Sequence, residues 1–144
     1  MIDPDREALL RSAIEDLYFA YRTFTALPDR RLADLGLGRT HHRILHFVRR
    51  DPGLSVGDLL AVLEVSKQAV HRPIKDLEER GYLAVTADDT DRRIRRLTLT
   101  PAGTGLEDQL TSLQMDLLAT AFDGLDDGAV AHWQQVMRRL AAGG

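Results

Sequence analysis

The chain contains no cysteine, which excludes disulfide bonds and redox sensing through a thiol. It also lacks an apolar run close to the ~20 residues that a membrane-spanning helix needs, and its N-terminus has no signal-peptide pattern. A cytoplasmic location is therefore expected. No repeats or low-complexity stretches interrupt the 144 residues, so we expect a single domain over residues 1–144 with a modest core.

An excess of positive charge is missing as well. The formal net charge is −3, which argues against indiscriminate attraction to phosphate. The charge is unevenly distributed, however, because residues 39–100 hold 12 Lys/Arg and 9 Asp/Glu, while the rest of the chain holds 7 and 13. A weakly basic segment in an acidic chain favours selective binding of an anionic partner.

An amphipathic helix with one cationic face is predicted between Ser66 and Gly81. Ser66 is a good N-cap residue, and Gly81 provides the left-handed conformation in which helices commonly end. Val70, Ile74 and Leu77 fall on one arc of the helix. The opposite arc carries only hydrogen-bond donors and cations: Lys67, Gln68, His71, Arg72 and Lys75. Such a helix would pack one face on a core and offer the other to an anion.

A second short helix is predicted just upstream, from about Val56 to Leu63. Ser55 can cap it, with Asp58 three residues further on. Two short capped helices joined by a tight turn form a helix-turn-helix. Two strands, 82–87 and 94–100, follow around a charged tip. The predicted fold class is mainly α with a small two- or three-stranded β wing, a winged helix-turn-helix.

Cap and proline signals predict four further helices. They run from Asp3-Pro4 to about Leu27, from a Thr40 cap to about Arg50, from Thr100-Pro101 to Gly124, and from an Asp126 cap towards the C-terminus. Residues 29–38 carry no clear signal and are expected to form a connector.

Three of these helices carry apolar stripes at helical spacing. The stripes are Leu10, Ile14, Leu17, Tyr21 and Phe24; Leu106, Leu110, Leu113 and Leu117; and Val130, Trp133, Met137 and Leu140. Core or subunit packing is the preferred interpretation, and a ligand-binding aromatic box is the alternative for the first stripe. Because the stripes exceed what one small winged domain needs, we expect a two-fold homodimer. Residues 1–38 and 101–144 would form the dimerisation region, and 39–100 the DNA-binding region.

Four segments, in matching order and spacing, resemble the MarR family of bacterial transcription regulators. They are Ser66-Lys67-Gln68-Ala69-Val70, residues 77–83 (LEERGYL), Asp91-Arg92-Arg93 and residues 99–103 (LTPAG). The resemblance implies a regulator, predicted to be a repressor, that binds an inverted-repeat operator on double-stranded DNA as a homodimer. It also implies a small-molecule effector bound between the dimerisation helices and the winged region. Three positions depart from the family pattern: Pro73 within the recognition helix, Glu64 where glycine is usual, and Arg95 in a wing strand.

The candidate DNA-binding residues are Ser66, Lys67, Gln68, His71, Arg72, Lys75, Asp91, Arg92, Arg93, Arg95 and Arg96. Gln68 and Arg72 can make paired hydrogen bonds to adenine and guanine, respectively. Lys67 and Lys75 are better placed to neutralise phosphates, and His71 suits either role.

The wing residues take their roles from the resemblance. It implies that Arg93 enters the minor groove while Asp91 supports its guanidinium, and narrow A·T-rich grooves do attract arginine. Arg92, Arg95 and Arg96 would contact phosphates. Arg95 shares a strand face with Leu97 and Leu99, so either the hairpin has left the core there or a bulge turns the side chain outward.

Pro73 removes a backbone donor, at a cost of about 3 kcal/mol in a helix interior, and is expected to bend the recognition helix. For this reason the family's base assignments are not transferred to this chain.

Other functions remain as alternatives. His42 and His46 are i, i+4 neighbours, which suggests a metal site, but without cysteine or a nearby acidic residue we prefer a surface or interface histidine pair and predict no metal or cofactor. The alternative for the cationic face is a solvated surface, as in a helical protein–protein interaction module that has kept the fold and lost DNA binding. No catalytic motif with supporting context is present, so no enzyme is predicted.

Overall fold

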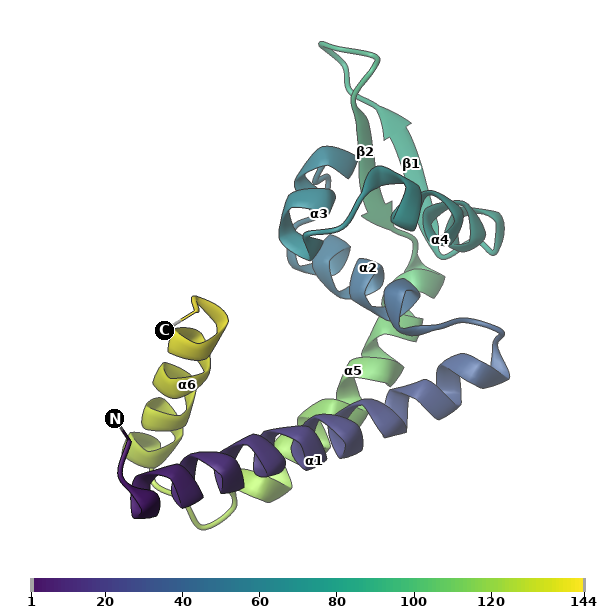
Figure 1. Ribbon diagram of the computed structural model, residues 1–144. Coiled ribbons are helices and arrows are strands. Elements are labelled where there is room, and N and C mark those ends of the chain that lie inside the picture. Colours follow the sequence, from purple (N-terminus) through teal and green to yellow (C-terminus); the bar gives the residue numbers. More distant parts are fainter. Residues whose placement is uncertain (1, 144) are drawn as a thin grey trace. The chain divides into compact units, whose positions relative to one another are not determined.

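A computed structural model describes residues 2–143, which contain six helices and one β-hairpin (Figure 1). The chain divides after Gln114 into two compact units. The first contains α1 (Pro4–Asp34), α2 (Arg39–Arg50), α3 (Val56–Leu63), α4 (Lys67–Glu79), β1 (Leu83–Ala87), β2 (Arg95–Leu99) and the start of α5 (Pro101–Phe122). The second contains the end of α5 and α6 (Asp127–Ala141). The predicted mainly helical fold with a small β wing is confirmed.

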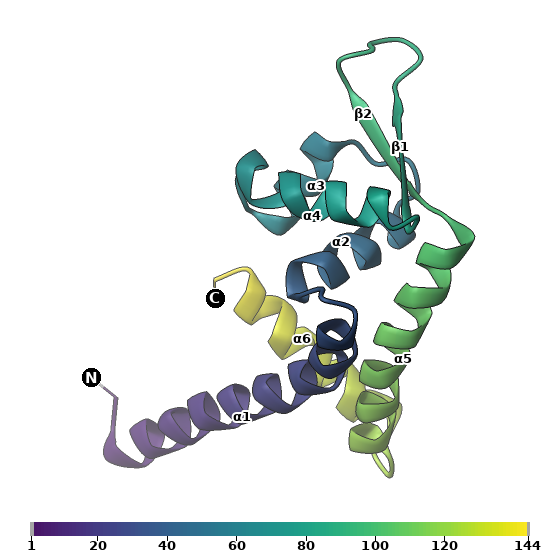
Figure 2. The ribbon, with the colours of Figure 1, turned by 90° about the vertical axis from the view of Figure 1, so that its right-hand side faces the viewer.

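The two strands form an antiparallel ladder that runs without interruption from the Leu83–Leu99 pair to the Ala87–Arg95 pair. An isolated bridge between Ser55 and Arg96 adds a short third partner to β2. Figures 1 and 2 show the hairpin extending beyond α3 and α4. The expected two- or three-stranded wing is therefore present, with boundaries within one residue of those predicted.

Most predicted helix starts are confirmed by a side-chain cap. Ser55 Oγ accepts a hydrogen bond from the Asp58 amide at 3.0 Å, and Ser66 Oγ accepts one from the Ala69 amide at 3.2 Å. Asp3 and Asp126 cap α1 and α6 in the same way. These caps satisfy amides that a helix leaves unpaired in its first turn.

The predicted end of the first helix at Leu27 is wrong. α1 continues through Pro28 to Asp34, so most of the expected connector at 29–38 is helical. Pro28 cannot donate a hydrogen bond to the Phe24 carbonyl four residues earlier. The Gln114 side chain of α5 does so instead, with Nε2 3.4 Å from that oxygen. Pro28 is itself buried, so the helix loses one internal hydrogen bond and gains packing.

The predicted Thr40 cap is also wrong. α2 begins at Arg39, and its N-cap is Gly38, which has no side chain to serve as a cap. His41 instead accepts from the N-cap residue itself, because its Nδ1 lies 2.9 Å from the Gly38 amide nitrogen. The N-terminus of α2 is therefore fixed by a hydrogen bond to a histidine side chain.

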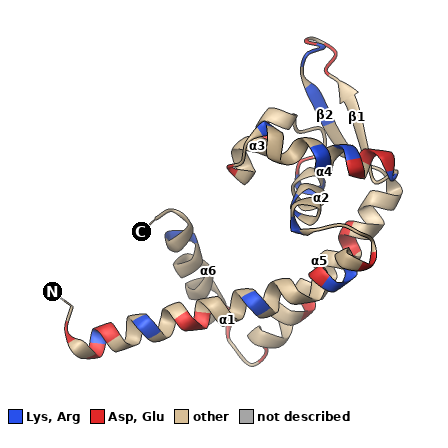
Figure 3. Cartoon of the chain, turned by 45° about the vertical axis from the view of Figure 1, so that its right-hand side comes forward, with Lys and Arg blue, Asp and Glu red and all other residues tan. Residues whose placement is uncertain are grey.

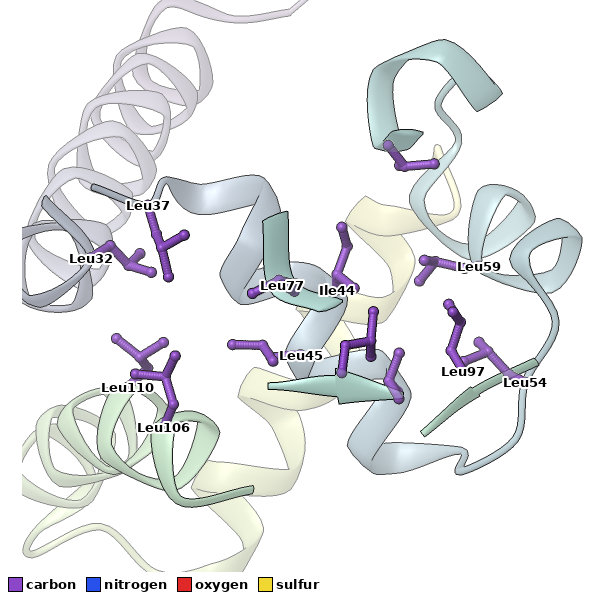
Figure 4. Packing of buried hydrophobic residues seen from close by; sticks show 13 residues of the cluster. Leu32, Leu37, Ile44, Leu45, Leu54, Leu59, Leu77, Leu97, Leu106 and Leu110 are labelled. Carbon is purple, nitrogen blue, oxygen red and sulfur yellow. The ribbon is translucent and has the colours of Figure 1, made fainter. Parts of the chain in front are cut away.

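One hydrophobic cluster holds the first unit together, and its side chains point towards one another (Figure 4). The buried residues of this cluster lie between Leu32 and Leu110. The fully buried members are Leu32, Ile44, Leu45, Val48, Leu59, Val70, Leu77, Leu97 and Leu110. Burial at about 25 cal/mol per Å² of apolar surface makes this cluster the main source of stability for the winged region.

The apolar stripe of α1 lies largely in solvent, with Leu10, Ile14, Leu17 and Tyr21 between 39% and 68% exposed. α6 has no buried residue, and Trp133 and Leu140 are 42% and 54% exposed. Leu106 and Leu110 of α5, in contrast, are buried. Over the described chain, no helix has the length and apolar character needed to cross a membrane.

Candidate nucleic-acid interface

α4 presents its cationic face to solvent. Val70 and Leu77 are buried on the inner side, and Ile74 is half-buried beside them. The predicted outer residues Lys67, Gln68, His71, Arg72 and Lys75 are all exposed. Figure 3 shows the basic residues of α4 and β2 in blue. A helix anchored by one face and exposing five donor side chains on the other can lie in a nucleic-acid groove.

α4 continues through Pro73 from Lys67 to Glu79. Pro73 lacks the amide that would bond to the Ala69 carbonyl, so this turn of the helix is short of one internal hydrogen bond. Pro73 is half-buried, whereas His71 and Arg72 beside it are exposed. The missing hydrogen bond therefore lies beside the cationic face of α4 and is not part of it.

An acidic side chain missed by the sequence analysis borders this face. Asp76 Oδ1 lies 3.0 Å from Arg72 Nε, and Asp76 Oδ2 lies 3.3 Å from Nε2 of His41 in α2. The i, i+4 spacing of Arg72 and Asp76 was visible in the sequence and is typical of an ion pair on one helix. The third member, His41, comes from 35 residues away, and no local pattern connects it to Asp76.

At the wing, Arg93 projects outward while Asp91 holds it from behind. Arg93 Nε and a terminal nitrogen lie 3.1 and 3.2 Å from the two Asp91 carboxylate oxygens. The Arg93 amide also donates to Asp91. Together these bonds hold the pKa of Asp91 below its usual value, so the carboxylate stays charged. The Arg93 side chain is nonetheless 91% exposed, an arrangement that presents a fixed cation to an anionic partner.

The other wing arginines differ in their surroundings. Arg92 and Arg95 are exposed. Since the ladder is regular up to the Ala87–Arg95 pair, a bulge does not account for Arg95; the hairpin has left the core at that point. Arg96 instead donates to Asp88 at 2.7 Å and to the Gly53 carbonyl at 3.1 Å. This arginine braces the hairpin against the turn before α3.

Asp88 organises the tip of the wing. Its carboxylate accepts bonds from the Thr90 and Asp91 amides as well as from Arg96. These bonds, the one from Arg96 foremost, hold the pKa of Asp88 below its usual value. The tip is therefore a folded turn, which keeps Arg93 at a defined position.

A groove of about 690 Å³ separates α3 and α4 from the wing. Its lining includes apolar side chains and, among the candidate residues, Lys67, His71, Lys75, Arg93 and Arg95. The structure therefore brings helix and wing candidates around one concave surface. Gln68 and Arg72 lie on the exposed face of α4 and are not part of its lining.

The His42–His46 pair is part of a polar network between α2 and α5. His42 is buried, and its Nε2 lies 3.3 Å from Thr111 Oγ1; burial, followed by the nearby His46, lowers the His42 pKa. His46 Nδ1 lies 3.6 Å from the buried Glu107, which also binds Arg49 at 2.6 Å. Among residues 2–143 no cluster of three or more His, Asp or Glu has metal-binding geometry.

A smaller pocket of about 290 Å³ lies among α1, α2 and α5. Aromatic and basic side chains dominate its lining: Tyr21, Phe24, Thr25, Pro28, Asp29, Arg39, His42, Arg43, His46, Phe47 and Gln114. One of these cations is already paired, because Arg39 donates to Asp29 at 2.8 Å. The pocket can accept a small molecule with an apolar body and a polar or anionic group.

Comparisons with known proteins agree with this architecture. The profile of the MarR family matches residues 35–94. The HTH-type transcriptional regulator PetP of Rhodobacter capsulatus is 40% identical over 131 residues, which cover 91% of this chain and 79% of PetP.

Two solved structures show the same fold. Bordetella bronchiseptica BpsR, studied for regulation of its DNA binding by 6-hydroxynicotinic acid, superposes with a TM-score of 0.69 at 24% identity, covering 90% of this chain and 98% of BpsR. The S. aureus MepR F27L mutant bound to an oligodeoxyribonucleotide gives 0.64 at 16% identity, covering 91% of this chain and 96% of MepR. With its helix-turn-helix, its wing and its close relation to PetP, this chain belongs to the MarR family of transcription regulators.

Proposed function

We propose that this regulator binds a specific inverted-repeat DNA operator as a homodimer. The observation that carries the proposal is the pairing of an exposed cationic face on α4 with an arginine, Arg93, held outward at the wing by Asp91. The relative MepR, which shares the fold, was solved with an oligodeoxyribonucleotide.

In this proposal α4 enters the major groove. Gln68 and Arg72 contact base edges, since both side chains can form paired hydrogen bonds with one base. Lys67 and Lys75 neutralise phosphates on either side, and His71 contacts a base or a phosphate. Ser66 uses its hydroxyl to cap the helix, and in this proposal the N-terminus of α4 that it caps lies at the DNA backbone.

The wing would contact the adjacent minor groove through Arg93. Arg92 and Arg95 are exposed and available for phosphates. Arg96 is only 41% exposed and already bonded to Asp88, so its assigned phosphate contact is secondary to its role in bracing the hairpin.

The homodimer is supported by the apolar surface that the chain leaves uncovered. Large apolar side chains on α1 and on residues 115–140 are between 37% and 68% exposed. Single soluble chains rarely leave large apolar patches in water, and a second copy related by a two-fold axis would cover these side chains. We therefore assign residues 1–38 and 101–144 to dimerisation and 39–100 to DNA binding.

We further propose that the regulator is a repressor released by a small-molecule effector bound in the pocket among α1, α2 and α5. Support comes from the aromatic and basic lining of the pocket and from BpsR, whose DNA binding 6-hydroxynicotinic acid regulates. No catalytic role is assigned, since the relatives are named as regulators.

Selection of bound duplexes from a random DNA library tests the proposal directly. We expect an inverted repeat with half-sites ~10 bp apart, centre to centre, and binding that weakens steeply with salt. Sedimentation should give the mass of a dimer at micromolar concentration. If the library yields no selected site and the protein shows no salt-dependent DNA binding, the result would favour the protein–protein interaction module instead.

Two variants separate the proposed roles on α4. Arg72→Ala should relax sequence preference and weaken operator binding by ~1–3 kcal/mol. Lys75→Ala should weaken binding evenly across sequences and lower the salt slope by about 1 per half-site. If both variants behave alike, the division between base and phosphate contacts is wrong.

A further inference from the structure

Asp76 connects the exposed arginine of the recognition helix to a fixed point in another helix. Its Oδ1 lies 3.0 Å from Arg72 Nε within α4, and its Oδ2 lies 3.3 Å from His41 Nε2 at the start of α2. The side chains become progressively less exposed along this row, from 71% for Arg72 to 23% for Asp76 and 13% for His41. The row therefore leads from solvent into the packed junction of α2 and α4.

His41 is held in one orientation and one tautomer. Its Nδ1 accepts the Gly38 amide hydrogen at 2.9 Å, so Nδ1 carries no proton. In the neutral ring the proton must then reside on Nε2, which donates it to Asp76 Oδ2. The Asp76 carboxylate is consequently fixed from behind by a ring that is itself anchored to the backbone.

The guanidinium nitrogen of Arg72 that lies nearest to Asp76 is Nε, at 3.0 Å. Within residues 2–143 the two terminal nitrogens of Arg72 make no hydrogen bond. Those nitrogens form the end of the arginine fork that matches O6 and N7 of guanine. The part of Arg72 that Asp76 leaves free is thus the part that a guanine needs.

We infer that Asp76, held by His41, is a positioning residue that fixes Arg72 for recognition of a guanine in the operator. The inference rests on the proposed DNA-binding function. A long flexible side chain loses conformational freedom when it is ordered on a base, and prior ordering by a fixed carboxylate reduces that loss. Because a carboxylate also repels nearby phosphates, Asp76 should weaken general DNA binding while sharpening base discrimination.

These two opposite effects, on general DNA binding and on base discrimination, distinguish a positioning role for Asp76 from a purely structural contact between α2 and α4. A structural tie would affect folding, and its loss would weaken binding to all duplexes alike. A positioning residue acts on one base pair, and only while Arg72 is present.

The test measures dissociation constants for wild type and variants on a library-selected duplex and on duplexes with each guanine of the half-site replaced in turn. Arg72→Ala identifies the base pair that Arg72 contacts. At that pair Asp76→Asn should lose about tenfold of the wild-type discrimination, within the range that a bidentate contact supplies. Its affinity for unrelated duplex DNA should be unchanged or higher. Asparagine can still accept from His41, so the fold should persist; Asp76→Ser is the second variant if it does not.

Two controls make the result specific. Glu79→Gln removes one exposed carboxylate from the same helix and should leave discrimination at that pair unchanged. In the double variant Arg72→Ala/Asp76→Asn, the second substitution should add no further loss of discrimination. His41→Gln should reproduce part of the Asp76→Asn effect, with melting temperatures recorded for every variant.

The outcomes distinguish a failure of the proposed DNA-binding function from a failure of the inference on Asp76. A wild type without sequence-selective binding overturns the proposed function and this inference with it. A selective wild type whose Asp76→Asn variant keeps full discrimination, or loses affinity equally for all duplexes, overturns the inference alone.

Discussion

The segment from Leu32 to Leu110 buries its apolar side chains internally, whereas the helical segments on either side leave theirs in contact with solvent. Every member of the buried hydrophobic cluster belongs to the first group. Ile14 of α1 and Val136 of α6 are 68% and 59% exposed. Both groups carry apolar stripes at helical spacing, so periodicity alone does not distinguish a core formed within one chain from an interface formed between two.

From this difference we expect substitutions in the winged region to change stability as they do in a monomeric protein. Substitutions in the terminal helices should change stability as they do in a subunit interface. Stability of the first depends on contacts within one chain. Stability of the second should depend on protein concentration, because association and folding are linked. The following substitutions test this division, from the largest expected effect to the smallest.

Leu59→Ala should lower the free energy of unfolding by about 2–5 kcal/mol, because it leaves a cavity at a fully buried position of α3. The loss should be the same at low and high protein concentration. Urea unfolding followed by circular dichroism measures it. Val62→Ala on the same helix, where the side chain is 40% exposed, should cost much less, and equal losses would contradict the assignment of the core.

Ile14→Asp should convert the proposed dimer to monomers at micromolar concentration. An unpaired charge in an apolar interface costs several kcal/mol, and ~3 kcal/mol corresponds to about a 100-fold weaker association. Sedimentation equilibrium measures the change. Ser12→Asp introduces the same charge on the same helix away from the stripe and should leave the dimer intact. A dimer that survives Ile14→Asp would exclude this face of α1 from the interface.

Pro73→Ala should raise the melting temperature, with a gain of up to about 3 kcal/mol if the restored amide bonds to the Ala69 carbonyl. We expect the same variant to bind its operator less well, because a bend at Pro73, expected from the sequence, would help to aim His71, Arg72 and Lys75. Thermal melting and operator titration on this one variant show whether Pro73 serves DNA binding. A higher melting temperature with unchanged affinity would mean that the bend is only tolerated, and lower stability would contradict both versions.

Glu64→Gly should stabilise the chain by about 1 kcal/mol without changing its oligomeric state. Glu64 ends α3 in the left-handed region, at φ 52° and ψ 46°, a conformation that costs an ordinary residue roughly 1–2 kcal/mol. Glycine adopts it without that strain. Glu64→Ala keeps the strain and should bring no comparable gain, so similar melting temperatures for the two variants would point to the lost charge instead.

The parts of the fold that sequence analysis predicted well depend on signals a few residues apart. Caps such as Ser55 and Ser66, the strand boundaries and the glycine-terminated end of α4 all belong to this class. The wing pair Asp91–Arg93 was expected from the family resemblance, and the structure shows its geometry in detail. The DNA-binding roles of these residues stay predictions.

Two of the missed contacts involve partners distant in sequence. Pro28 does not end α1, since Gln114 satisfies the carbonyl that proline leaves free and the ring itself is buried. The first residue of α2 was missed for a local reason, because the Gly38 amide donates to His41 three residues later. The link between His41 and Asp76 requires two helices to be packed, so no pattern within either helix could reveal it.

Gly103 allows the first turn of α5 to lie directly against the backbone of Tyr82. A Cβ atom at this position would lie 1.9 Å from the Tyr82 carbonyl oxygen, and the adjacent Thr100 donates hydrogen bonds to Gly81 and Tyr82. The first turn of α5 is thus pressed against the segment that ends α4 and begins β1. The start of α5 therefore lies closer to the backbone at the start of β1 than a residue with a Cβ atom would allow, so this junction requires glycine.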